Sequence, residues 1–538
     1  MSAFLTRKGL LSASCLSTSL IFTLVSGLPA AHAQAVSSPE QSPHRARIEQ
    51  VFEGLGHGRS IGEVAVSPDG RRVAWIEGRG EGLLSVAPIA DLSKAERVPV
   101  TLSSPVQHCR QSEAIWAPDS KALAFFSNCE SPGGQMELYL SKLDGTPAKR
   151  LTELKGYESS PAFSPDGTKI AFLYVEGATR PAGALAAMKP SSGVIGEEGI
   201  EIQRVAMAAV DPAAPAAPQQ VTPANLHAYE FDWAPDSQGL AYIAAQPPGE
   251  NNWWVAKLYT QKIGGPARAI LAPTEIAGPL HNLQIAVPRW SPDGSRIAFI
   301  GGLMSDQGST GGDIWIVSAE GGALRDLTPG RQSSPAWIEW DGNHHLFVSE
   351  FAGGSSDLVR FQIKGDQLAD ESHIISIPGS VGDGRLEGSL SSTADRSLWV
   401  FSASSFERPP EIYSVHAGNV SPVAGFAGIT QLSHVNDGVV PVWGKAVSLD
   451  WKNEGYDVQG WLLLPQDYDP QKKYPLIVEV HGGPAALVEP RWGSGGGISA
   501  VALSALGYFV LAPNPRGSYG QGEAFTQANR EDFGYGDL

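Results

Sequence analysis

The sequence is poor in cysteine and in basic residues, and it lacks common metal-binding motifs. Its 538 residues include three cysteines and neither a Cys-x-x-Cys nor a His-Glu-x-x-His segment, so nothing in it favours a metal site. Lys and Arg number 39 against 56 Asp and Glu, which gives a formal charge of −17. Because an acidic chain repels nucleic-acid backbones and anionic membranes, we expect neither as a partner. We also expect no cofactor.

Long apolar runs are also scarce, and the one that exists stands at the N-terminus. Arg7 and Lys8 precede an apolar stretch over residues 16–28, and residues 31–33 (Ala-His-Ala) offer small side chains at a cleavage position. The stretch is short and interrupted by Ser and Thr, which disfavours an uncleaved membrane anchor without excluding it. We predict a secretory signal peptide over residues 1–33 and a mature protein in the periplasm or outside the cell.

The two cysteines that remain after the signal are Cys109 and Cys129. They lie equally far along the chain from Asp119, which we interpret as the tip of a hairpin, so they would face each other on paired strands. An oxidising compartment permits a disulfide at such a position. Two buried thiols are the alternative, and we predict the disulfide.

Glycine and proline, in contrast, are abundant at 61 and 40 residues, which favours a β-rich protein with many turns. A short segment recurs seven times: a residue that is aromatic in most copies, Ser or Ala, then Pro, Asp, and Gly or Ser, followed by a short alternating strand. Proline presets φ for the turn, aspartate bonds back to the backbone, and glycine or serine tolerates the tight conformation. The copies are centred on Asp69, Asp119, Asp166, Asp236, Asp293, Asp341 and Asp395, and the last two are degenerate.

Seven such hairpins at intervals of about fifty residues predict a blade-by-blade propeller, because each small sheet buries its faces only against its neighbours. A set of unrelated β-sandwich hairpins is the alternative, but a sandwich would not need the same turn each time. We therefore predict an all-β seven-bladed propeller over residues 34–430.

The pattern changes from about residue 440. Residues 474–480 form a near-continuous apolar run, which is typical of a strand buried on both faces of a parallel sheet. A helical segment over residues 498–506 and a second apolar strand over residues 508–512 follow. A strand, a helix and a strand joined by short links predict a βαβ unit.

The first of these strands ends in His481, Gly482 and Gly483. Glycines at such a position let backbone N–H groups face a cavity without side chains in the way. In acyl-transfer enzymes, donors of this kind stabilise the oxyanion of the tetrahedral intermediate. A plain glycine-rich turn is the alternative, and the tripeptide alone leaves it open.

Taken together, these segments resemble a known family. The resemblance is carried by the Trp-Ser-Pro-Asp-Gly repeats and by residues 460–462 (Gly-Trp-Leu), 481–484 (His-Gly-Gly-Pro) and 514–518 (Asn-Pro-Arg-Gly-Ser). These segments are similar to those of the prolyl oligopeptidase family of serine peptidases, in its bacterial acylaminoacyl-peptidase and dipeptidyl-peptidase-like branch. The resemblance covers the chain after the signal. It implies a seven-bladed propeller followed by an α/β-hydrolase domain, which cuts short peptides that reach an internal cavity.

The resemblance also implies roles for particular residues. The N–H of Gly483 would bind the oxyanion, and His481 and Gly482 would shape its loop. Arg516 and Gly517 would hold the loop after the next strand.

A pair of propeller glutamates is implied as well, which would grip the free amine of a peptide substrate. Glu197 and Glu198 lie in a comparable region, between the third and fourth repeats. Two adjacent carboxylates could bind an ammonium group. A solvated acidic loop is the alternative interpretation of this pair.

The chemistry of the family needs a serine on a Gly-x-Ser-x-Gly turn, then an aspartate and a histidine, in that order. The one match, around Ser60, precedes the first repeat and follows no buried strand, so we do not assign it. We expect all three residues beyond Leu538, an incomplete hydrolase domain over residues 440–538, and no hydroxyl in this chain with a positioned base. This serine-type oligopeptidase or aminopeptidase fragment is therefore predicted to be inactive. The alternative is a TolB-like propeller that acts as a protein-binding module.

Overall fold

The computed structural model describes residues 43–78, 82–100, 109–131, 134–178, 200–247, 249–418, 423–493 and 499–537. The predicted signal peptide and the Glu197–Glu198 pair lie outside these residues. The chain divides into two compact units, Met1–Ala46 and Arg47–Leu538, and the architecture below is that of the second. In the part of the chain that the structure describes, no helix is long and apolar enough to cross a bilayer.

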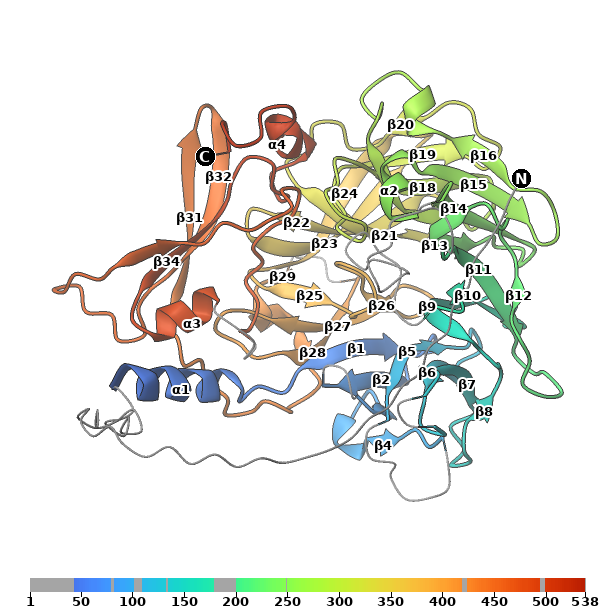
Figure 1. Ribbon diagram of the computed structural model, residues 1–538, viewed down its shortest axis with the longest axis horizontal. Coiled ribbons are helices and arrows are strands. Elements are labelled where there is room, and N and C mark those ends of the chain that lie inside the picture. The colour runs from blue at the N-terminus through green and yellow to red at the C-terminus, as the bar shows by residue number, and fades with distance from the viewer. Residues whose placement is uncertain are drawn as a thin grey trace, which may run out of the picture. The chain divides into compact units, whose positions relative to one another are not determined.

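Residues 61–431 form seven small sheets, most of them antiparallel meanders of strands that follow one another in the chain (Figure 1). The first three contain β1 (Ile61–Val66), β2 (Arg72–Glu77), β3 (Leu84–Pro88) and β4 (Glu96–Arg97); β5 (Gln111–Trp116), β6 (Leu123–Ser127), β7 (Glu137–Ser141) and β8 (Lys149–Arg150); and β9 (Gly156–Phe163), β10 (Lys169–Glu176), β11 (Gln203–Ala209) and β12 (Gln219–Gln220). The fourth and fifth contain β13 (His227–Trp233), β14 (Gly239–Ala245), β15 (Lys257–Lys262) and β16 (Arg268–Leu271); and β17 (Gln284–Trp290), β18 (Arg296–Gly302), β19 (Asp313–Ser318) and β20 (Arg325–Asp326).

The last two of these sheets are interleaved in the chain, because β29 (Val423–Ala424) follows strands of the seventh sheet but pairs with the sixth. The sixth contains β21 (Ser334–Asp341), β22 (His345–Ala352), β23 (Ser355–Ile363) and β24 (Leu368–Ile377), to which β29 adds in parallel. The seventh contains β25 (Ser380–Gly382), β26 (Ser391–Ser392), β27 (Leu398–Ser404), β28 (Glu411–His416) and β30 (Thr430–Gln431). A short helix α2 (Gly249–Asn252) and four 3-10 turns, Leu92–Lys94, Trp253–Val255, Pro273–Glu275 and Phe426–Gly428, complete this region among the described residues.

The recurring turn lies where the sequence predicts it, between two neighbouring strands of each sheet. In the third copy, the side chain of Asp166 accepts hydrogen bonds from Ser164 Oγ at 2.6 Å and from the backbone N–H of Thr168 at 2.9 Å. These bonds lower the pKa of Asp166 to about 2. Gly167 has φ of +71°, and Ser237 takes the same conformation in the fourth copy with φ of +61°. The local chemistry of the repeat is therefore confirmed.

The repeats also join each sheet to its neighbour. The Trp116 indole donates to the carbonyl of Ala65 at 3.0 Å, and the Trp233 indole donates to that of Ala162 at 3.1 Å, in each case one sheet back. Side chains of the first and seventh sheets share a core that includes Val64 and Val400. The first sheet of the succession therefore packs on the last.

Residues 446–514 form a separate sheet of β31 (Ala446–Asn453), β32 (Tyr456–Leu463), β34 (Phe509–Asn514) and β33 (Leu476–Val478), in that spatial order (Figure 1). The strand β33 is parallel to β34, and α3 (Ala500–Ala505) connects them. The predicted βαβ unit is confirmed. Beyond it lie α4 (Glu523–Thr526) and a 3-10 turn, Gln527–Asn529.

The first strand of this unit is not buried on both faces, although its apolar run is typical of a strand that is. The strand β33 lies at the edge of its sheet, and Leu476 and Val478 are 57% and 53% exposed. Among the described residues, no strand pairs with its outer edge. An apolar run shows that a strand prefers burial, but the neighbours that cover it must come from elsewhere in the fold.

The helix α1 (Pro43–Leu55) packs on this C-terminal sheet and on α3. Val51 and Leu55 belong to the same core as Trp461 and Val501. The predicted propeller range of residues 34–430 includes this helix, yet its apolar face contributes to the C-terminal core. Amphipathic periodicity predicts that a helix buries one face, but it does not identify the partner.

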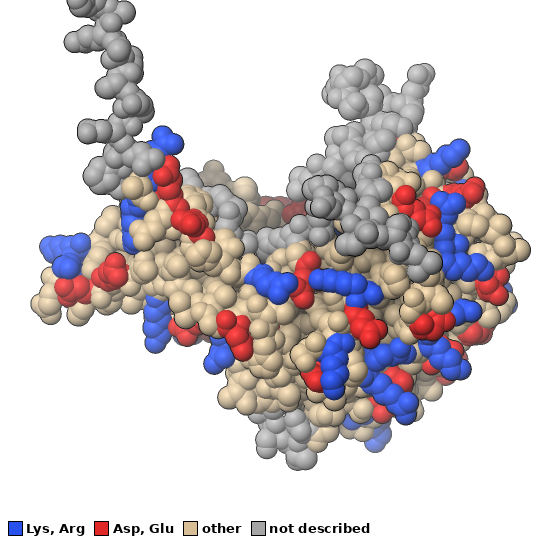
Figure 2. Space-filling model, turned by 90° about the horizontal axis from the view of Figure 1, so that it is seen from below, with Lys and Arg blue, Asp and Glu red and all other residues tan. Residues whose placement is uncertain are grey.

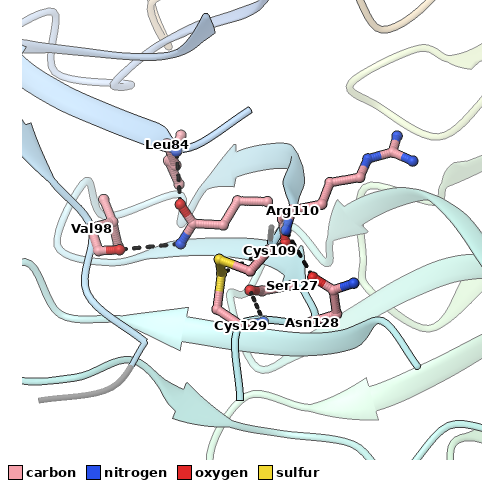
Figure 3. Close-up of a disulfide and its surroundings, with 8 residues drawn as sticks. Leu84, Val98, Cys109, Arg110, Ser127, Asn128 and Cys129 are labelled. Atoms are coloured by element: carbon pink, nitrogen blue, oxygen red, sulfur yellow. Dashed lines mark hydrogen bonds between the residues drawn. A yellow bond between two sulfur atoms is a disulfide. The ribbon is translucent and has the colours of Figure 1, made fainter. Parts of the chain in front are cut away.

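A disulfide joins Cys109 and Cys129, whose Cα atoms are 4.8 Å apart, at the open end of the β5–β6 hairpin (Figure 3). Two hydrogen bonds hold the same end: the backbone N–H of Arg110 donates to Asn128 at 2.7 Å, and that of Cys129 donates to Ser127 Oγ at 3.1 Å. The two cysteines lie beyond the pair Gln111 and Ser127 in the strand register, so they face each other as their spacing around the turn predicts.

Charged side chains are mixed on the face that Figure 2 shows, where Lys and Arg lie among Asp and Glu. No broad region of one sign is visible there among the described residues. The net negative charge is thus dispersed on this face, and the absence of nucleic-acid and membrane partners stays a prediction.

Candidate active site

The His481–Gly483 loop follows β33 and lines a cavity of about 690 Å³. Val478 and Val480 form one part of its wall. The other lining residues come from β31, β32, β34 and the C-terminal segment, and they include Trp451, Val458, Leu511, Pro513, Pro515, Arg516, Phe533 and Asp537. The glycine loop is therefore placed at the rim of a space large enough for a ligand.

The two glycines of this loop differ in what the fold demands of them. Both are exposed, and within the described residues neither backbone N–H is paired with an acceptor. Gly483 has φ of +140°, and a Cβ built on it would lie 2.9 Å from the nitrogen of Ala485. A Cβ on Gly482 would meet nothing within 4 Å. The backbone conformation at position 483 requires glycine, whereas position 482 has room for a side chain. The backbone N–H groups of both residues are free to donate to an anion.

The imidazole of His481 bridges this loop to the next one. Its Nδ1 lies 2.9 Å from the carbonyl oxygen of Gly482, and its Nε2 lies 2.9 Å from Ser518 Oγ. A carbonyl can only accept, so Nδ1 carries the proton and Nε2 accepts from the serine hydroxyl. Burial lowers the pKa of His481, which favours this neutral form.

The expectation that no hydroxyl in this chain has a positioned base is therefore wrong for Ser518. The residue is fully buried, however, and it does not line the cavity. Its backbone is bound as well, since its N–H donates to Pro515 and its carbonyl accepts from Thr526 Oγ1. A nucleophile must reach the carbonyl carbon of its substrate, and this hydroxyl has no open path to one. The pair acts as a brace between two loops.

Further bonds tie the same two loops together. The side chain of Asn514 accepts from the backbone N–H of Val488 at 2.7 Å and donates to Gln459 at 2.8 Å. The backbone N–H of Tyr519 donates to the carbonyl of Ala486 at 2.9 Å. These contacts hold the glycine loop against β32 and the segment that follows β34.

Arg516, for which the resemblance implies a role in holding the loop after β34, reaches the C-terminal segment. Its Nε donates to the carbonyl of Gly536 at 2.6 Å, and its guanidinium lies 5.6 Å from the centre of the Tyr456 ring. An ion pair with Glu454 at 3.2 Å adds a further contact. Arg516 thus fixes one wall of the cavity, and the implied role stays a prediction.

The loop is also anchored to the seven-sheet region. The backbone N–H of Ala485 donates to Ser305 Oγ at 2.7 Å, and the N–H of Leu303 donates to the Glu523 carboxylate at 2.8 Å. Burial raises the pKa of Glu523 to about 8. Tyr519 packs in a small core with residues of the sixth sheet. The glycine loop is therefore held from both sides.

The remaining predicted positions are not found among the described residues of this site. Glu197 and Glu198 lie outside the described residues. Ser60 lines a different cavity, of about 680 Å³, and has no imidazole partner within the described chain. No group of three or more His, Cys, Asp or Glu residues that could hold a metal ion occurs in the described part.

Comparisons with known proteins agree on one class. No family model matches this chain. An uncharacterized peptidase of Bacillus subtilis, YuxL, is 24% identical over 538 residues, which cover 88% of this chain and 72% of the relative. A probable dipeptidyl-peptidase 5 of Aspergillus niger is 28% identical over 319 residues, covering 56% of this chain and 40% of the relative. The chain thus spans less than half of the second relative.

Solved structures show the same likeness. An uncomplexed acylaminoacyl peptidase of Pyrococcus horikoshii matches with a TM-score of 0.61 and 14% identity, over 90% of this chain and 70% of that one. An acylaminoacyl peptidase in complex with Z-Gly-Gly-Phe-chloromethyl ketone gives a TM-score of 0.61 at 15% identity, with the same coverage of 90% and 70%. At these identities, the likeness shows the fold.

Proposed function

Since its relatives and structural neighbours support a place for this chain in the prolyl oligopeptidase family of peptidases, we propose that it serves serine-type hydrolysis of short peptides. The observation that carries the proposal is the pair of free glycine N–H groups at 482 and 483, held at the rim of a cavity. Such donors stabilise the oxyanion that forms when a peptide carbonyl is attacked. The substrate class is supported by the peptide-derived inhibitor bound to one structural neighbour.

In this proposal the seven sheets are the blades of a seven-bladed propeller, and β31–β34 with α1 and α3 form the first part of an α/β-hydrolase domain. The shared core of the first and seventh sheets supports a closed ring. The parallel pair β33 and β34, with the glycine loop at the carboxyl end of β33, supports a hydrolase sheet.

We assign the described residues a supporting part in this reaction. His481 and Ser518 position the oxyanion loop. Among the described residues, no serine that opens into a cavity is hydrogen-bonded to an imidazole. We further propose that the 538-residue chain by itself is inactive, because its one Gly-x-Ser-x-Gly segment, around Ser60, precedes the first repeat and follows no buried strand. A purely protein-binding, TolB-like role is not favoured, because the relatives named above are peptidases.

Export is part of the proposal. Residues 1–33 have the pattern of a signal peptide, and the disulfide between Cys109 and Cys129 suits an oxidising compartment. We propose a periplasmic or secreted protein. Edman sequencing of the protein recovered from its native host should start near Gln34, and an intact Met1 would contradict export with cleavage.

The coding sequence beyond the codon for Leu538 provides the first test of the catalytic part. The proposal expects a Gly-x-Ser-x-Gly segment within about a hundred residues, because this motif follows the next buried strand of the hydrolase sheet. The purified 538-residue chain should not hydrolyse peptide p-nitroanilides. Turnover that is blocked by a serine-directed inhibitor and co-purifies with the chain would show that the nucleophile lies within it.

The two glycines offer a matched pair of variants for the second test, in the form that carries the nucleophile. Gly483→Ala forces a Cβ against Ala485 and should displace the loop, which lowers kcat by about a hundredfold, as for loss of one oxyanion donor. Gly482→Ala has room for its methyl group and should leave kcat nearly unchanged. Equal effects of the two variants would contradict the assigned role of the loop.

A further inference from the structure

A second cavity, of about 370 Å³, lies among the seven sheets and shares no lining residue with the one at His481. The strands β5, β9, β13, β17 and β21 and the segment from β25 to β27 line it. Five carboxylates and three guanidinium groups face it: Glu113, Glu230, Asp232, Glu339, Asp383, Arg289, Arg385 and Arg396. What such a cavity can bind depends on which of these groups are already engaged.

The carboxylates are engaged in holding the structure together. Glu113 accepts from the backbone N–H of Ser160 at 2.5 Å, and Glu230 accepts from that of Val287 at 2.6 Å, in both cases on the next sheet. Asp232 accepts from the N–H of Trp290 at 2.8 Å in the same way.

The other two carboxylates of the cavity are bound as well. Glu339 forms an ion pair with Arg396. Asp383 accepts from Ser389 Oγ at 2.5 Å and from the backbone N–H of Arg385 at 3.0 Å. Each acidic side chain that lines the cavity therefore has a donor of the protein as its partner.

Two of the guanidinium groups, in contrast, make few hydrogen bonds, although their positive charges lie near carboxylates of the wall such as Asp383. Arg289 donates to the carbonyl of Pro288 at 2.9 Å, and Arg385 donates to that of Pro161 at 3.0 Å. Neither guanidinium has a carboxylate partner within 4.0 Å among the residues that the structure describes. A guanidinium carries five N–H donors in a planar fork that suits a carboxylate. The side-chain groups of the cavity that can still form hydrogen bonds are thus mainly the N–H donors of Arg289 and Arg385.

The carboxylates of the wall are not all fully ionised near neutral pH. Burial raises the pKa of Glu113 to about 7, so this group is about half protonated there, whereas Asp232, whose pKa burial raises to about 6, stays mostly ionised. Guanidinium groups keep their charge under these conditions. The wall also contains Phe231, Trp337 and Leu386, which offer apolar contact beside the two arginines.

We propose that this cavity binds the free C-terminal carboxylate of a short peptide, with Arg289 and Arg385 as its ligands and the apolar wall in contact with the last side chains. The assignment goes beyond the proposed hydrolysis and does not depend on it, because binding here needs no nucleophile. Failure of one proposal would leave the other standing.

The test is isothermal titration calorimetry of the full chain with acetyl-Ala-Ala-Ala, which has a free carboxylate, and with its C-terminal amide. Both probes have a blocked N-terminus, so an amine cannot contribute. The acid should bind at least about tenfold more tightly than the amide, as expected for loss of charge-assisted hydrogen bonds. Equal affinities, or no detectable binding of the acid, would overturn the proposal.

Variants identify the site. Arg289→Gln and Arg385→Gln should each weaken binding of the acid by about tenfold and leave the amide unaffected. Arg71→Gln, at an exposed turn, is the matched control and should bind as the unmodified chain does. Arg289→Lys and Arg385→Lys keep the charge but lose the fork, so intermediate losses are expected if a Gln variant fails to fold. Unchanged binding in folded variants at both positions would overturn the assignment.

Discussion

The buried carboxylate of Glu158 leads to a pH-dependent prediction about stability. Glu158 lies on β9, is 6% exposed, and accepts a hydrogen bond from the amide of Gln135 at 3.1 Å. Burial, together with the nearby charges of Glu113 and Glu137, raises its pKa from 4.5 to about 9. The folded state therefore holds a proton that the unfolded state releases as the pH rises above 4.5.

The sign of the effect follows from this difference in bound protons. Because the folded state binds more protons between pH 4.5 and 9, the free energy of unfolding falls as the pH rises through that window. At pH 7 the loss relative to acidic pH is about 3 kcal/mol, at 1.36 kcal/mol for each unit of pH above the unfolded pKa. Glu158→Gln cannot ionise and keeps an oxygen for the Gln135 amide. It should therefore be about 3 kcal/mol more stable than the unmodified chain at pH 7, and nearly equal to it at pH 4.

Urea unfolding at pH 4 and at pH 7 measures this difference. Glu96→Gln, on an exposed strand, is the matched control and should change neither value. A stabilisation of the Glu158→Gln variant that is the same at both pH values would refute the reasoning, since it would not come from proton linkage. A loss of stability at pH 7 would show that Glu158 is ionised and paired in the folded protein.

Three further predictions concern the disulfide, the edge strand and the brace. Replacing both Cys109 and Cys129 by Ser should lower the free energy of unfolding by about 3 kcal/mol, given their sequence separation of 20, and reductant should then have no further effect. The double variant Leu476→Lys and Val478→Lys should aggregate less than the unmodified chain in light scattering, because it places charge on the exposed edge of β33. Unchanged scattering would contradict aggregation through that edge. Ser518→Ala should speed amide hydrogen exchange in residues 481–486 by removing the bond to His481, and unchanged exchange there would contradict the brace.

Local features were the most predictable part of the fold. The Asp166 turn and its counterparts depend on residues within five positions of one another, so their chemistry can be read directly from the chain. The facing positions of Cys109 and Cys129 follow from equal distances around one such turn. The βαβ unit is similarly encoded by two apolar runs and the helical segment between them.

The candidate site was only partly predictable. The glycine loop at 482 and 483 could be found, because a motif at the end of a strand is continuous in sequence. The Ser518 partner of His481 could not, since the two residues are 37 positions apart and no spacing rule joins them. The unpaired state of Arg289 and Arg385 depends on contacts from several sheets, which no local pattern reports.

The sequence by itself determined the succession of hairpins, the pairing geometry of the cysteines and the change of architecture near residue 440. Only the tertiary structure decided that β33 is exposed at an edge, that α1 packs with the C-terminal core, and which buried charges have partners. The physical reason is range: turn and strand preferences arise between neighbours in the chain, whereas burial and charge pairing depend on groups that folding brings together from distant positions.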